Sequence, residues 1–110
     1  ISLSHVDAFF NGDLDTLMEF NVSPMAWSPL GGGKPVAVDE RALFNKAAKY
    51  NASYSQLQLA WLLKHPSAIF PVIGTTKPER IIECAKSFDI NLDPQDWFDM
   101  LKWTTGTDVA

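Results

Sequence analysis

The order of apolar and polar positions along the chain predicts alternating strands and helices. Two short apolar runs, at 24–27 and 69–73, lie between helix-breaking residues and indicate strands. The second run is apolar at nearly every position, which is typical of a strand buried on both faces of a parallel sheet. Residues 1–3 could be the tail of a further strand. With helices between these strands, the pattern predicts repeated βα units and a parallel sheet.

Helical spacing of apolar residues indicates helices that begin near residues 13, 40, 54, 78 and 94. The helix from 54 to 64 is apolar over more than half its surface, so we expect it to be buried against the sheet. It should begin at a capping box formed by Ser53 and Gln56 and end at His65, before Pro66. The apolar faces of the other helices are predicted to be Leu14, Leu17 and Met18; Leu43, Phe44, Ala47 and Ala48; Ile81, Ile82 and Ala85; and Trp97, Phe98 and Leu101.

Residues 69–84 combine a strand, a tight loop and a helix start, and this combination favours an anion site. Thr76 and Glu79 have the spacing of a second capping box, with Pro78 in the first helical turn. Free backbone N–H groups and the positive end of the helix dipole would point toward the strand's exit. Lys77 and Arg80 add two cations one turn apart. The alternative is an ordinary capped helix whose charges are solvated.

The earlier strand ends in a second region with ligand-binding character. Trp27 offers a broad aromatic face, and three glycines follow within the loop 28–35, where a backbone can approach a ligand closely. The loop is not a Walker A motif, because Pro35 follows Lys34 where Ser or Thr is required. Because ligands of parallel βα folds bind beyond the strands' carboxyl ends, we expect the two exits to lie side by side. The alternative for Trp27 is a plain core residue.

Composition narrows the class of protein. The 110 residues fit one domain with no internal boundary, and 46% are hydrophobic. Thirteen acidic residues against nine basic ones argue against a nucleic-acid or membrane-surface partner. A single cysteine, Cys84, and the absence of a leader favour the cytoplasm. Because the first residue is Ile1 rather than Met, we expect the interior of a longer polypeptide.

Two motifs carry a family resemblance. AWSPLGGGK at 26–34 and PVIGTTKPERIIEC at 71–84 resemble the last third of an aldo-keto reductase, and residues 2–33 resemble the bacterial oxidoreductases of that superfamily. The resemblance implies an α/β fold that is a C-terminal segment of a (β/α)8 TIM barrel, with the end of strand 6, strands 7 and 8, and their helices. A whole barrel needs about 250 residues, so the chain would be a fragment.

The resemblance also implies a cofactor, NADPH, and a set of cofactor-binding residues. Trp27 would stack on the nicotinamide ring. Ser28 and Leu30 with the glycine loop, including Gly31 and Gly32, would line the pyrophosphate. The adenosine end would be held by Gly74, Thr75, Thr76, Lys77 and Arg80 at the 2′-phosphate, with Glu83 and Cys84 near the adenine. The family usually has Asn at the position of Cys84.

No catalytic or metal-binding residue is predicted in this chain. The family's catalytic Asp, Tyr, Lys and His precede this segment, and the chain has no carboxylate pair, Cys-His pair or metal-ligand cluster to replace them. The expected function is the cofactor-binding part of an NADPH-dependent reductase of small carbonyl substrates. The alternatives are a non-enzymatic NADPH-binding relative, similar to potassium-channel β subunits, and another phosphate-binding barrel. We expect the 110 residues alone to self-associate and to be inactive.

Overall fold

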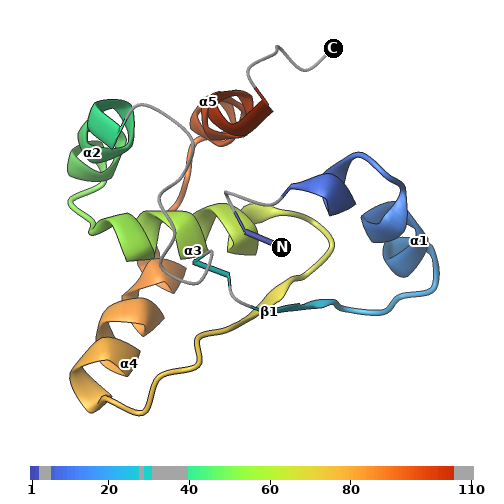
Figure 1. The fold of residues 1–110 in the computed structure, drawn as a ribbon, viewed down its shortest axis with the longest axis horizontal. Helices are drawn as coiled ribbons and strands as arrows, with labels where there is room; N and C mark the ends of the chain where they lie inside the picture. Colours follow the sequence, from blue (N-terminus) through green and yellow to red (C-terminus); the bar gives the residue numbers. More distant parts are fainter. Residues whose placement is uncertain (3–5, 28, 31–39, 106–110) are drawn as a thin grey trace.

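The computed structural model describes residues 1–2, 6–27, 29–30 and 40–105 (Figure 1). Its elements, in chain order, are η1 (Asp7–Phe9), α1 (Asp13–Glu19), β1 (Met25–Trp27), α2 (Glu40–Lys49), α3 (Tyr54–Lys64), β2 (Phe70–Val72), α4 (Pro78–Ala85), η3 (Lys86–Asp89) and α5 (Pro94–Thr105). Within these ranges, no helix has the length and apolar character needed to cross a membrane.

The two strands form a parallel sheet, as the βα pattern predicts. Met25 pairs with Phe70, Ala26 with Pro71, and Trp27 with Val72. One further hydrogen bond joins the two segments just before β1 begins: the Phe70 N–H donates to the Pro24 carbonyl at 2.8 Å. Ser2 occupies a single bridge position, in keeping with the tail of a further strand. Parallel pairing in this register places the carboxyl ends of both strands at one edge of the fold.

The two faces of the sheet differ in burial. Ala26 and Ile69 are buried in the core. On the other face Met25, Trp27, Phe70 and Val72 are all exposed; Phe70, for example, is 60% exposed. The prediction that the second strand is buried on both faces is therefore wrong for this structure. The reason is that the described helices cover one face only (Figure 1).

Helix α3 is the centre of the packing, and its predicted boundaries are confirmed. The Ser53 hydroxyl accepts from the Gln56 N–H while the Gln56 side chain accepts from the Ser53 N–H, which completes the capping box. The helix stops at Lys64, and His65 is already extended. Five of its side chains are buried: Leu57, Leu59, Ala60, Trp61 and Leu62. It contacts β2 as well as α2, α4 and α5, so it is buried on most of its circumference, as predicted.

A pair of tryptophans fastens α5 to α3. The Trp61 and Trp97 rings stack with centroids 5.2 Å apart and planes 17° apart. Each indole N–H also donates to the other residue's backbone carbonyl, at 3.0 Å from Trp61 and 2.8 Å from Trp97. The edge of Phe9 approaches both rings. The paired hydrogen bonds satisfy both indole N–H groups, and the stacked rings add a contact between α3 and α5.

Several predicted apolar faces are only partly correct. Leu14, Leu43, Ala47 and Leu101 are buried as predicted. Residues predicted to be buried that are exposed instead are Met18, Phe44, Ala48, Ile81, Ile82, Ala85 and Phe98. Apolar spacing indicates which side chains share a helix face, but a neighbouring element must still cover that face. No described element covers the Ile82 side of α4, and Cys84 is the buried residue of that helix.

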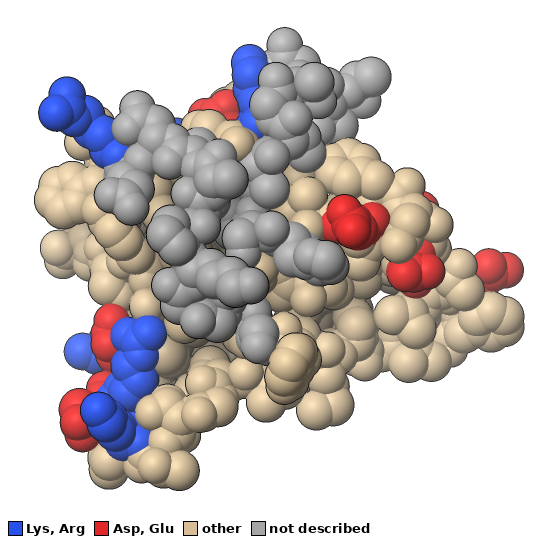
Figure 2. Space-filling model, in the orientation of Figure 1, with Lys and Arg blue, Asp and Glu red and all other residues tan. Residues whose placement is uncertain are grey.

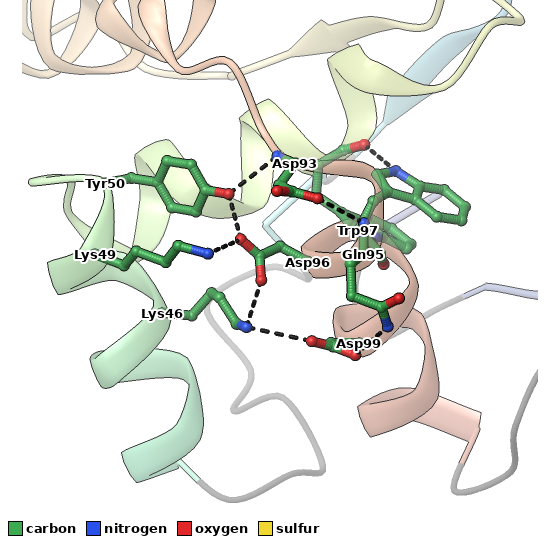
Figure 3. A network of polar contacts seen from close by, with 9 residues as sticks. Lys46, Lys49, Tyr50, Asp93, Gln95, Asp96, Trp97 and Asp99 are labelled. Atoms are coloured by element: carbon green, nitrogen blue, oxygen red, sulfur yellow. Dashed lines mark hydrogen bonds and ion pairs between the residues drawn. The ribbon is translucent and has the colours of Figure 1, made fainter.

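A buried aspartate joins α2 to α5 (Figure 3). The Asp96 side chain is 5% exposed. One of its oxygens accepts from the Lys46 ammonium at 2.7 Å, and the other accepts from the Lys49 ammonium at 2.7 Å and from the Tyr50 hydroxyl. We call these four residues the Asp96 cluster. At its rim Lys46 also reaches Asp99, at 3.4 Å.

Full pairing explains how a carboxylate is tolerated at this depth. Burial alone would raise the pKa of Asp96, but hydrogen bonds from Lys46, Lys49 and Tyr50 outweigh it and hold this pKa well below the usual range. Asp96 therefore stays ionised at any ordinary pH. The Asp96 cluster is a structural link on the outer side of α3, away from the sheet (Figure 1).

Candidate cofactor site

The exits of β1 and β2 lie next to each other, as predicted. Trp27 is the last residue of β1 and faces Val72, the last residue of β2. Trp27 is 82% exposed in this chain. After the strand Pro29 is buried and Leu30 is half-buried. The predicted contacts Ser28, Gly31 and Gly32 lie outside the described residues.

The loop after β2 turns sharply toward α4. Gly74 has φ +58°, a left-handed backbone that side chains disfavour, so this conformation favours glycine. The Thr75 hydroxyl accepts from the Lys77 N–H at 3.3 Å and tightens the turn. Thr76 and Lys77 are exposed. The loop therefore presents its polar groups to solvent just beyond the strand end.

The start of α4 differs from the prediction. The cap residue is Lys77, with extended backbone and no side-chain capping bond, so the box between Thr76 and Glu79 does not form. The reason is Pro78, which occupies the first helical position and keeps the preceding residue out of the helical region. Because the cap lies at Lys77, Thr76 falls one position too early to serve as cap. Among the described residues, the side chain of the cap residue Lys77 therefore makes no capping bond at the positive end of α4.

Arg80 and Glu83 form a half-buried ion pair on the side of α4 that faces α3. The Arg80 Nη1 donates to Glu83 Oε2 at 3.0 Å, and the two side chains are 36% and 35% exposed. The other guanidinium nitrogen, Nη2, donates to the Ser55 hydroxyl of α3 at 2.8 Å. Figure 2 shows basic and acidic side chains next to each other at the α4 end of the molecule.

Glu83 is itself fixed by the start of α3. Its Oε1 accepts from the Ser53 hydroxyl at 2.8 Å, and its backbone carbonyl accepts from the Gln56 side chain at 2.9 Å. The hydrogen bond from Ser53, and then that from Arg80, lower the pKa of Glu83 and keep it ionised. The sequence indicates Ser53 and Gln56 as a helix cap, but their contacts with Glu83 join segments 27 to 30 residues apart and carry no local signal.

Cys84 lies on the opposite, inner side of α4. Its side chain is 4% exposed and its thiol is free. It lines a cavity of about 410 Å³ together with apolar residues of α3 and β2, including Leu59 and Phe70. Of the described residues predicted to bind cofactor, Cys84 is the one least open to solvent. Its contact with adenine stays a prediction.

These features define a class: a segment of a parallel βα fold whose predicted cofactor-binding loops follow the carboxyl ends of the strands. The comparisons narrow it. A model of the aldo/keto reductase family matches residues 9–102, and the chain belongs to this family.

Relatives of known name agree with this assignment. The chain is 40% identical over 114 residues to a 6-dehydroglucose reductase of Agrobacterium fabrum, with 100% of this chain and 38% of that protein covered. It is 37% identical over 118 residues to the oxidoreductase YdhF of Escherichia coli, covering 99% of this chain and 39% of the relative. A putative voltage-gated potassium channel subunit beta of Schizosaccharomyces pombe is 37% identical over 57 residues, or 52% of this chain and 17% of that protein.

Solved structures agree on the fold. The thermostable aldo-keto reductase Tm1743 superposes with a TM-score of 0.80 at 25% identity, over 92% of this chain and 36% of that one. A Gox0644 variant in complex with NADPH superposes with a TM-score of 0.71 at 23% identity, over 100% of this chain and 39% of that one. The chain thus spans well under half the length of the relatives it matches. Its fold is α/β, a C-terminal segment of the (β/α)8 barrel of these reductases.

Proposed function

We propose that this chain is the cofactor-binding part of an NADPH-dependent aldo-keto reductase. The complete reductase would be a polypeptide that carries this chain together with the remaining strands of the barrel. When bound, NADPH supplies the hydride for reduction of an aldehyde or ketone. The residues described here would bind and orient the cofactor, whereas proton transfer would fall to the family's catalytic residues on the other strands.

The observation that carries the proposal is the adjacency of an exposed aromatic face and an open helix start. Trp27 ends β1 in register with Val72, and the loop that follows Val72 leads within a few residues to the uncapped start of α4. A flat ring and an anion site at neighbouring strand exits suit the two ends of a dinucleotide. This fit supports Trp27 at the nicotinamide, with Ser28, Leu30, Gly31 and Gly32 along the pyrophosphate.

The adenosine end would lie over the start of α4. Gly74, Thr75, Thr76 and Lys77 would surround the 2′-phosphate, and Arg80 would pair with it through charge-assisted hydrogen bonds. Glu83 and Cys84 complete the predicted set on the adenine side. The proposal also includes a reducing compartment, the cytoplasm, in keeping with the free thiol of Cys84.

The named relatives suggest a first substrate. Two 6-dehydroglucose reductases, at 40% and 36% identity, match nearly the whole chain. We therefore propose a sugar-derived aldehyde of this kind as the carbonyl substrate. A regulatory role without turnover is the second candidate, and the similarity to a putative potassium channel subunit favours keeping it. Family membership leaves the third candidate, a different phosphate-binding barrel, without support.

The test uses the complete reductase. Titration with NADPH should quench tryptophan fluorescence and raise the melting temperature, and 6-dehydroglucose should then be reduced with loss of NADPH absorbance. Binding of NADPH without reduction of 6-dehydroglucose or of a panel of simple aldehydes would favour the regulatory candidate. Absence of NADPH binding would overturn the proposal altogether.

A further inference from the structure

The Arg80 guanidinium is held at two points by groups of different charge. Glu83, on the same helix, accepts from Nη1 at 3.0 Å. Ser55, in the first turn of α3, accepts from Nη2 at 2.8 Å. A guanidinium has five N–H donors in one rigid plane, so these two bonds fix the direction of the plane. The other three donors have no acceptor among the described residues.

Both anchors are themselves immobilised by the start of α3. Ser53 accepts from the Gln56 N–H at 3.2 Å and donates to Glu83 at 2.8 Å, so the carboxylate is tied to the helix cap. Ser55 stands two residues after this cap, on a helix whose following residues fill the core. The orientation of Arg80 is therefore set by the rigid central helix and not by the long side chain alone.

The two anchors have opposite effects on an incoming anion. Glu83 orients the guanidinium but also cancels part of its charge. The Ser55 hydroxyl orients it without contributing charge, so it retains the attraction for an anion while reducing the rotamer freedom lost on binding. At 36% exposure the Arg80 side chain is still open to a ligand.

We propose that Ser55 is a positioning residue for recognition of the cofactor's 2′-phosphate, acting through Arg80. This inference rests on the proposed function, because it assumes that the phosphate lies at the start of α4. NADH lacks the 2′-phosphate. Substitution of a residue that positions Arg80 for this phosphate should therefore change the affinity for NADPH and leave the affinity for NADH unchanged.

The test compares NADPH and NADH affinities of the complete reductase and two variants by fluorescence titration. Ser55→Ala removes the hydroxyl that accepts from Arg80. It should lower the affinity for NADPH by roughly two- to tenfold, the range expected for one hydrogen bond, and leave the affinity for NADH unchanged. Ser55→Thr keeps a hydroxyl and should restore the parent's preference for NADPH. Melting temperatures without cofactor report any damage to the fold separately.

Two outcomes would overturn the inference, and they differ from failure of the proposed function. Equal weakening of both cofactors by Ser55→Ala would mean a general structural role. An unchanged NADPH affinity would mean that Glu83 alone orients Arg80. If the parent reductase binds neither cofactor, the proposed function fails, and the inference fails with it.

Discussion

The Asp96 cluster is an ionic link between α2 and α5, whereas the Arg80–Glu83 ion pair lies within α4 and is joined to α3 by hydrogen bonds with Ser53 and Ser55. The two groups also differ in access to solvent. Asp96 is 5% exposed, and both of its oxygens have partners. Arg80 and Glu83 are each about one-third exposed, and the guanidinium keeps donors to spare. A carboxylate with every site filled suits a structural link, whereas a partly open cation held in one orientation suits ligand binding.

The sheet repeats this contrast between closed and open surfaces. Its Ala26 and Ile69 side is packed against the helices, and its Met25, Trp27, Phe70 and Val72 side is open. In a closed barrel such an inward face packs against the other strands. The predictions below test how far closed and open surfaces correspond to stability and to binding.

The largest effect is expected when the 110 residues are expressed alone. Four exposed apolar side chains on a two-stranded sheet form a surface that a second copy can cover. We predict oligomers or aggregates by light scattering, weak NADPH binding at best, and no reduction of a carbonyl substrate. A monodisperse monomer that oxidises NADPH with substrate would contradict both the open-face argument and the absence of catalytic residues.

Substitution of Asp96 should have the next largest effect. Asp96→Ala would leave the Lys46 ammonium, only 18% exposed, without its main partner, and we expect a loss of about 2–4 kcal/mol in the free energy of unfolding of the complete reductase. Asp99→Ala, at the 38% exposed rim, is the matched control and should cost under about 1 kcal/mol. NADPH affinity of the folded fraction should be unchanged in both variants. A large loss of affinity would mean that the two regions are coupled.

The contribution of Asp96 to stability should depend on pH in the acid range. The pKa of Asp96 is depressed in the folded state, so its stabilising contribution is complete above the unfolded value of 3.8 and is lost as pH falls below that value. Asn does not titrate, so Asp96→Asn lacks this pH-dependent contribution to stability. The stability difference between parent and Asp96→Asn should therefore shrink as the pH of denaturant unfolding is lowered from 5 toward 3. A difference independent of pH would show that the pKa of Asp96 is the same in the folded and the unfolded protein.

The smallest of these effects belongs to Trp27. Trp27→Ala should weaken NADPH and NADH equally, by about 1 kcal/mol, because both carry the nicotinamide ring on which it would stack. The melting temperature without cofactor is measured alongside, because it separates a stacking role from a packing role. Phe20→Ala, which removes an aromatic side chain 71% exposed before β1 begins, is the control and should alter neither. A lower melting temperature with unchanged affinity would return Trp27 to a core role.

The sequence predicts features of this fold that depend on neighbouring residues. The capping box of Ser53 and Gln56, the stop before Pro66 and the parallel order of the strands are confirmed, because short-range chemistry and connectivity determine them. The second box failed for an equally local reason, since Pro78 set the helix start after Lys77.

Features that depend on distant partners could not be predicted. Asp96 is bound by residues 46 to 50 positions away, and nothing near it in the sequence indicates burial. Ser55 meets Arg80 across 25 residues. Conversely, Ile82 has apolar spacing but is 60% exposed, because burial requires an element that the described part does not provide. The adjacency of the two strand exits could be predicted from the sequence, whereas the contacts that orient the side chains near them could not.

The most direct test of the central claim, that the start of α4 binds the 2′-phosphate, is the ratio of NADPH to NADH affinity in Arg80→Ala. In the complete reductase we predict that the substitution weakens NADPH binding by roughly 1–3 kcal/mol and leaves NADH binding almost unchanged. Lys86→Ala, which removes an exposed cation just beyond the other end of α4, should leave the ratio intact. Equal weakening of both cofactors by Arg80→Ala would contradict the claim.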